Sequence, residues 1–211
     1  MEKKINNNGY EYIDLGLPSG TLWAACNVGA SKPTDYGQYF QWADTNGYTI
    51  DQVGKDKQFN WNNYKWGSTI NFTKYTSIGE TLDSEDDAAH ANMGGDWHIP
   101  SPAQIWELIY NTIADEATLD GVKGMKFTSK KDVSKFIFVP AAGVVWDGSN
   151  YFAERYGNIW SSMLSTEFAR NAQYLYFGYT GASQYLYLCS RAAFIMTKSR
   201  TSGLSVRGVI G

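Results

Sequence analysis

The chain has 211 residues and a formal net charge of −3 at pH 7, and 16% of its residues are aromatic. This length suits one domain that buries a substantial core. The weak negative charge, without any block of lysine and arginine, argues against nucleic acid as a partner. Frequent glycine and aromatic residues favour short strands joined by turns.

Apolar runs in the chain are short. Residues 136–145 form one of the longest, whereas about 20 consecutive apolar residues are needed to cross a bilayer. We therefore expect no membrane insertion. The basic residues near the start are not followed by an apolar stretch, so the sequence as written predicts no secretory signal.

The first part of the chain predicts short strands. Residues 12–15 and 21–25 read as a hairpin, because the Leu-Pro-Ser-Gly sequence between them is typical of a turn. Residues 35–44 contain four aromatic side chains and predict a strand over an aromatic cluster. Residues 44–80 carry few regular signals, and we expect an ordered, irregular insertion there.

Residues 83–113 carry the helical signals. Ser84 is the expected N-cap of a first helix that ends at a Gly-Gly pair. Ser101 is the expected N-cap of a second helix, with proline next and Gln104 completing a capping box. Its apolar face is predicted to hold Ile105, Leu108 and Ile109.

The rest of the chain reads as short strands, mainly after residue 124. Strands come first, two helices lie in the middle, and a run of strands ends the chain. This order predicts an α+β fold and not an alternating βαβ fold.

Six phrases occur in a characteristic order: YIDLGLPSGTLWAACNVGA, DYGQYFQWAD, DSEDDAAHANMGGDWHIPSPAQIWELI, FVPAAG, IWSS and SGLSVRGV. Together they resemble the Fibrobacter succinogenes major paralogous domain of Bacteroidetes surface proteins and their phages. The resemblance covers nearly the whole chain. The family usually has arginine at the position of His98.

The resemblance implies one C-type-lectin-like domain over residues 1–211, with two helices flanking short antiparallel sheets and adjacent N- and C-terminal strands. Similar proteins are diversified by retroelements in a C-terminal segment, which corresponds here to residues 149–200. The resemblance also implies an extracellular location, on a virion tail or a bacterial cell surface. A trimer is expected if the chain forms a fibre tip.

Catalysis is not expected from the residues. The chain has two histidines, His90 and His98, and no nucleophile elbow or metal-ligand spacing. The fold implied by the resemblance also occurs in the formylglycine-generating enzyme, but a shared fold is not shared chemistry. Cys26 and Cys189 fit no metal site, and either two free thiols or a disulfide is compatible with the sequence. We therefore expect no cofactor.

An acidic cluster near residue 85 has two interpretations. Carboxylates are the ligands that Ca²⁺ prefers, but carboxylates also stabilise the first turn of a helix. The sequence lacks EF-hand spacing, so we expect no metal. The residues concerned are Asp83, Glu85, Asp86 and Asp87.

Tyrosines are concentrated near residue 180, where Gln-Tyr-Leu-Tyr occurs twice. Alternation in a strand places leucines on one face and tyrosines on the other. The tyrosines either pack in a core with satisfied hydroxyls or form an exposed face whose composition is typical of antibody paratopes. The candidate ligand-binding residues are Tyr151, Tyr174, Tyr176, Tyr179, Tyr185, Tyr187, Arg191 and Phe194.

The expected function is non-enzymatic binding of a protein or glycan receptor on a cell surface, through a variable surface rich in tyrosine. Two alternatives remain open. One is an adhesin or glycan-binding module of fixed specificity, and the other is an enzyme of the formylglycine-generating kind.

Overall fold

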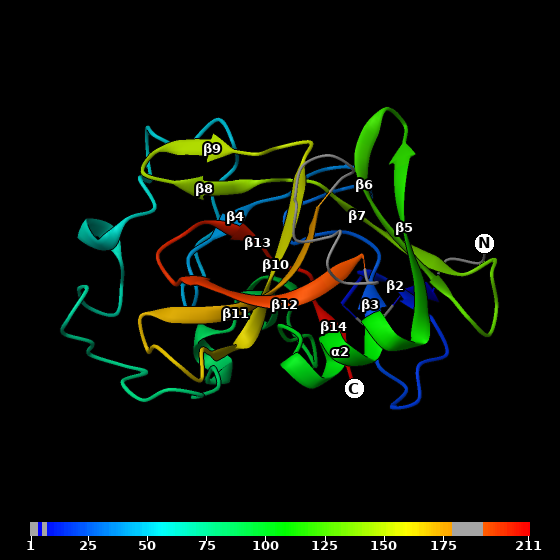
Figure 1. Ribbon diagram of the computed structural model, residues 1–211, viewed down its shortest axis with the longest axis horizontal. Coiled ribbons are helices and arrows are strands. Elements are labelled where there is room, and N and C mark those ends of the chain that lie inside the picture. The colour runs from blue at the N-terminus through cyan, green and yellow to red at the C-terminus, as the bar shows by residue number, and fades with distance from the viewer. Residues whose placement is uncertain (1–3, 6–7, 179–191) are drawn as a thin grey trace.

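The structure is a computed structural model that describes residues 4–5, 8–178 and 192–211 (Figure 1). Strands hold 38% of the residues and helices 12%, and the strands form four sheets. The protein is therefore mainly β. The prediction of an α+β, C-type-lectin-like fold with two helices flanking the sheets is wrong.

The helical region is shorter than predicted. A 3-10 turn (η2, Ser84–Asp86) occupies the expected first turn, and α1 (Ala88–Met93) is capped by Asp87 instead of Ser84. α2 (Pro102–Asn111) has the predicted capping box on Ser101. The chain then enters β5 (Thr112–Leu119) directly and pairs along its whole length with β6 (Val122–Ser129). Pairing with β6 therefore places residues 112–119 in a strand, although the sequence predicted no strand there.

Both ends of the chain meet in one sheet with the order β1-β2-β3-β14. Its strands are β1 (Lys4–Ile5), β2 (Glu11–Asp14), β3 (Leu22–Ala24) and β14 (Val209–Ile210). The predicted hairpin is confirmed by antiparallel pairing of β2 with β3. The expected adjacency of N- and C-terminal strands is also seen, because β14 pairs with β3.

The central sheet has the order β12-β11-β10-β13-β4. Its long strands, β10 (Tyr156–Leu164), β11 (Asn171–Gly178) and β12 (Ala193–Ser199), are antiparallel neighbours. The short strands β13 (Leu204–Ser205) and β4 (Tyr39–Phe40) complete it. β11 therefore has a hydrogen-bonded neighbour on each side.

Two smaller sheets lie beside the central sheet (Figure 1). β5, β6 and β7 (Phe136–Pro140) form a three-stranded sheet, and β8 (Val144–Trp146) forms a hairpin with β9 (Ser149–Tyr151). A bridge between Val145 and Gly203 connects this hairpin to the chain near β13.

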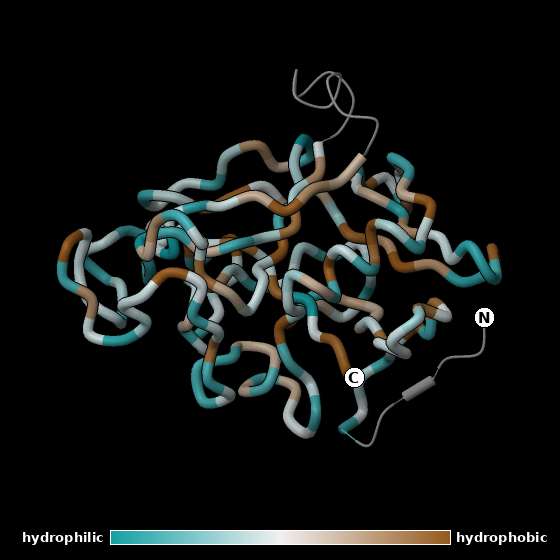
Figure 2. The backbone as a smooth tube through the Cα atoms, turned by 60° about the horizontal axis from the view of Figure 1, so that its bottom comes forward, coloured by the Kyte–Doolittle hydropathy of each residue, from teal (hydrophilic) through white to brown (hydrophobic). Residues whose placement is uncertain are grey.

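Hydrophobic clusters cover both faces of the central sheet. Tyr174 and Trp160 belong to one cluster, whereas Leu175 and Phe177 belong to the other, as strand alternation requires. The apolar face of α2 packs into the second cluster as predicted, with Ile105, Leu108 and Ile109 all buried. Figure 2 shows the apolar parts of the chain mostly in the interior and the polar parts mostly in outer loops.

Residues 44–80 contain one short 3-10 helix, η1 (Trp61–Asn63), and several isolated bridges. Arg200, which is buried, attaches the segment to the domain. Its Nη1 atom donates to the Tyr75 carbonyl at 2.8 Å, and its guanidinium lies 3.9 Å from the ring centroid of Phe72. None of the described helices is long and apolar enough to span a membrane.

Candidate functional site

Five aromatic side chains form a continuous row across the β8–β9 hairpin and the start of the β10–β11 pair. Neighbouring ring centroids are 6.1, 6.3, 5.0 and 5.5 Å apart. Each ring is tilted relative to the next by 45 to 55°. We call this set the aromatic row, and its members in order are Trp146, Tyr151, Phe152, Tyr156 and Tyr176.

One end of the aromatic row faces solvent. Trp146, Tyr151 and Phe152 have exposed fractions of 59%, 41% and 50%. Tyr156 and Tyr176 are half-buried. Single exposed apolar residues are ordinary, but adjoining exposed aromatic rings usually mark an interaction site.

The other end of the row continues into the core. The Tyr176 ring lies 6.4 Å from that of Tyr174, which lies 6.2 Å from that of Trp160. Trp160 is completely buried, and its Nε1 donates to the carbonyl of Phe40 at 2.7 Å. The half-buried members of the row therefore rest on side chains that cannot move without disturbing the core.

The loop that carries Phe152 has an unusual backbone. Phe152 and Glu154 have φ angles of 62° and 64°, in the left-handed region that costs a non-glycine residue about 1–2 kcal/mol. The loop is held by backbone hydrogen bonds from Glu154 to Ala141 at 2.7 Å and from Tyr156 to Phe152 at 3.0 Å. Five further non-glycine residues of the described structure have positive φ angles, so this conformation fixes the loop but does not by itself mark a site.

Asn150 and Tyr39 attach the hairpin to the central sheet. The Asn150 Nδ2 atom donates to the Tyr39 hydroxyl at 3.0 Å and to the Ala142 carbonyl at 3.2 Å. The Tyr39 hydroxyl donates to the same carbonyl at 2.7 Å. Tyr39 is fully buried, and this burial raises the pKa of its hydroxyl well above the usual range. The β8–β9 hairpin, which carries Trp146 and Tyr151, is thus held against the central sheet.

Charged residues lie next to or near the exposed rings along the chain. Asp147, Glu154 and Arg155 are all exposed. The Oδ1 atom of Asp147 accepts a 2.9 Å hydrogen bond from the Asn60 side chain. The surface therefore offers apolar ring faces with carboxylate acceptors and guanidinium donors close to them in sequence.

The structure places three of the predicted residues at or beside this surface. Tyr151 and Tyr176 are members of the row, and Phe194 of β12 is half-exposed and directly opposite Tyr176. Tyr179, Tyr185, Tyr187 and Arg191 lie outside the described residues, as does Cys189.

Tyr174 corrects the prediction of an exposed tyrosine face, because it is only 6% exposed. It lies on the interior strand β11, beneath a cluster that covers that face of the sheet. Burial raises the pKa of its hydroxyl well above the usual range, and Tyr176 acts in the same direction. For Tyr174, packing in a core is the correct interpretation. Leu175 is buried on the opposite face as predicted, and Phe177 is buried there beside it.

The candidate list omitted Trp146, Phe152 and Tyr156. The Asp147-Gly148 pair between two short aromatic-containing runs is a hairpin signal that was available in the sequence. The sequence could not show that the hairpin lies close to the start of β10, because this closeness depends on tertiary contacts.

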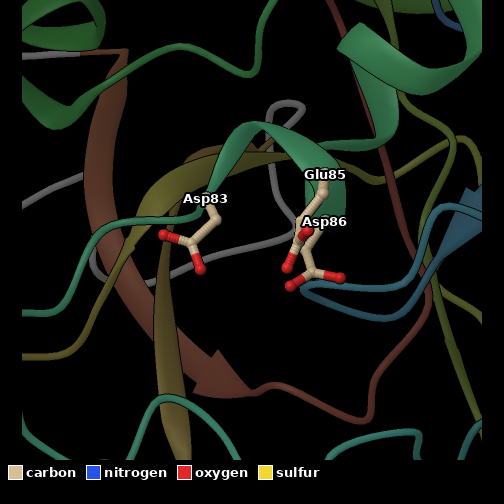
Figure 3. A group of neighbouring side chains, drawn as sticks. All are labelled: Asp83, Glu85 and Asp86. Carbon is tan, nitrogen blue, oxygen red and sulfur yellow. The ribbon is translucent and has the colours of Figure 1, made fainter.

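The acidic cluster near residue 85 is paired with lysine. Figure 3 shows the carboxylates of Asp83, Glu85 and Asp86 close together. The Lys74 Nζ atom lies 2.7, 2.8 and 2.6 Å from them in that order. Burial acts to raise the pKa of Asp86, but hydrogen bonds from Lys74 and Lys65 outweigh it and lower that pKa. The cluster therefore carries its own counter-charge and gives no support to a calcium site.

Comparison with known proteins gives no assignment. No protein-family model, no curated protein and no solved structure matches the chain.

Proposed function

We propose that the protein is a non-catalytic binding protein that recognises a receptor on a cell surface through the aromatic row. The observation that carries the proposal is the set of three adjoining rings of Trp146, Tyr151 and Phe152, each at least 41% exposed. A folded protein normally keeps so many neighbouring aromatic rings from water unless they serve in binding.

Rigidity of the surface supports binding. Aromatic side chains give large contact areas at a low cost in side-chain entropy. The left-handed backbone at Phe152 and the partly buried hydrogen bonds of Asn150 fix the rings before a ligand arrives. A ligand then meets a preorganised surface, which lowers the entropic cost of association.

We further propose that residues 149–200, which contain Tyr151, Phe152, Tyr156 and Tyr176 of the aromatic row, are the variable part of the chain. Retroelements of this kind mutate codons at adenines. Tyrosine, arginine and cysteine, which all occur in that segment, are among the residue types that such mutations produce. A virion tail and a bacterial cell surface are both suitable locations.

The position of Trp146 favours a binding surface in which one part is not diversified. It precedes residues 149–200, and tryptophan is not among the residue types expected from adenine-directed mutagenesis. An adhesin of fixed specificity is the second candidate function. The gene neighbourhood separates the two: diversification requires a nearby reverse transcriptase and a near-copy of the 3′ end that differs at adenines. A neighbourhood that lacks both leaves the fixed adhesin.

The binding proposal is tested with fluorescently labelled protein on a panel of bacterial and epithelial cells. Phe152→Asn removes the ring and retains a residue that tolerates the left-handed backbone. Phe168→Asn is the matched control, because Phe168 is 52% exposed and is not a member of the row. We expect binding to fall for Phe152→Asn and to be unchanged for Phe168→Asn. Equal binding by both variants and the wild type would refute the proposal.

A further inference from the structure

We propose that the ligand of the aromatic row is an uncharged glycan, whose sugar rings stack on Trp146, Tyr151 and Phe152 while hydroxyl groups bond to the carboxylates of Asp147 and Glu154. This inference rests on the proposed binding function and specifies the chemical class of its ligand.

The exposed rings suit stacking with sugars. The centroids of Trp146 and Tyr151 are 6.1 Å apart, and those of Tyr151 and Phe152 are 6.3 Å apart. The face of an aromatic ring is negative and attracts the weakly positive C–H bonds on one side of a sugar ring. Three separate rings in a row offer successive stacking positions, which suits a chain of sugars better than a single small molecule.

The neighbouring polar groups suit hydroxyl recognition. An ionised carboxylate only accepts hydrogen bonds, and charge makes these bonds stronger than neutral ones. Asp147 directly follows Trp146, and its Oδ1 atom is already positioned by the Asn60 amide at 2.9 Å. Glu154 is exposed two residues after Phe152. Asp147 and Glu154 are thus the carboxylate acceptors that the chain offers within two residues of an exposed ring of the row, and a sugar hydroxyl is a donor suited to them.

Charge indicates which glycans fit. Two carboxylates, Asp147 and Glu154, lie among the exposed residues of this surface, with one arginine, Arg155. Sialylated or sulfated chains would bring further negative charge close to the carboxylates, which is unfavourable at short range. Uncharged hexose chains avoid that repulsion.

Other ligand classes fit less well. A protein interface buries roughly 800 Å² on each side and centres on aromatic anchors in desolvated pockets. Trp146, Tyr151 and Phe152 are exposed to solvent, unlike desolvated anchors, and the charged Asp147 lies between the first two along the chain. Two cavities in the described part of the chain are lined by other segments, one by residues from 9–11 and 24–33 with Met93 and the other by residues 106, 165–167, 173 and 195–197.

The inference is tested on an array of uncharged oligosaccharides, followed by titration calorimetry with the best of them. We expect the full chain to bind at least one, and Tyr151→Ser or Phe152→Asn to weaken binding about three- to tenfold. Asp147→Asn should weaken it by a similar factor, because asparagine keeps the backbone but loses the charge. Phe168→Asn should bind as the wild type does. Sialylated and sulfated versions of the same chain should bind less well.

Treating the target cells separates this inference from the binding proposal. Periodate oxidises sugars, and a protease removes surface proteins. We expect periodate to abolish cell binding by the wild type. A second outcome is that protease abolishes cell binding, periodate leaves cell binding unchanged and Phe152→Asn still lowers it. In that case the row binds a protein, and only the glycan inference is refuted. If Phe152→Asn binds cells as the wild type does, the binding function of the row is refuted.

Discussion

The rings of Tyr156 and Tyr176 lie 5.5 Å apart at a tilt of 45°, across the neighbouring strands β10 and β11. This contact joins the exposed loop residues to the buried sheet. On one side Tyr156 contacts Phe152, and on the other Tyr176 contacts Tyr174, which is buried against Trp160. The surface that we propose for binding is therefore supported by the core, and the two can be separated by mutation.

Tyr174 and Tyr151 should respond differently to truncation. Tyr174→Ala removes a buried aromatic side chain and should lower the free energy of unfolding by about 3–5 kcal/mol. Tyr151→Ser removes a ring that is 41% exposed and should lower it by less than about 1 kcal/mol. Urea denaturation followed by tryptophan fluorescence measures both. Similar losses for the two variants would contradict the assigned burial.

Asn150→Ala should loosen the β8–β9 hairpin. It removes the 3.0 Å bond to the Tyr39 hydroxyl and the 3.2 Å bond to the Ala142 carbonyl, and the loss of each such hydrogen bond costs about 0.5–1.5 kcal/mol. We also expect faster hydrogen exchange at the backbone amide of Val145, which bonds to Gly203. Asn62→Ala serves as the control, because Asn62 is exposed. An unchanged exchange rate in Asn150→Ala would show that the hairpin is held by other contacts.

Gly157 should tolerate alanine only if Phe177 becomes smaller. A β-carbon at Gly157 would overlap the Phe177 ring, which is 1% exposed and cannot move outward. Gly157→Ala should therefore destabilise the fold by about 1–3 kcal/mol. In the double variant with Phe177→Leu the two costs should be less than additive. A double-mutant cycle in urea measures this coupling, and strict additivity would argue against the contact.

Lys74→Met should change the acid dependence of stability. The folded-state pKa of Asp86 is lowered, so its contribution is complete above the unfolded pKa of about 3.9 and is lost as pH falls through the folded value. Without Lys74, repulsion within the cluster raises that pKa. The variant should be less stable than the wild type at pH 7, and the difference should shrink at lower pH.

Lys55→Met is the control for this comparison, because Lys55 is exposed. Unfolding in urea at several pH values measures the effect. A Lys74→Met difference that stays constant from pH 7 to acid conditions would contradict a role of Lys74 in holding the Asp86 carboxylate.

Local signals in the sequence identified several elements because they depend only on nearby residues. The Ser101 capping box and the apolar spacing of α2 are confirmed for this reason. The β2–β3 hairpin is confirmed because its turn residues lie between its strands. The predicted start of the first helix is too early in the chain. Asp87 competes with Ser84 as the N-cap, and its side chain accepts the capping hydrogen bonds from the backbone amides of residues 89 and 90.

The candidate site was only partly predictable. The sequence predicted Tyr151 and Tyr176 as members of the site. The role of Trp146 depends on a hairpin folded against the central sheet, so no local pattern could reveal it. The same is true of the lysine among the acidic residues, because Lys74 is separated in sequence from Asp83.

By itself the sequence determined the alternation of β11, which sends Leu175 and Phe177 to one face and Tyr174 and Tyr176 to the other. The tertiary structure alone decided what covers each face. Tyr174 lies beneath a packed cluster and Tyr176 lies at its margin beside Tyr156, although both occupy equivalent positions in the alternation. Periodicity specifies the direction of a side chain, whereas burial depends on which distant segments pack over it.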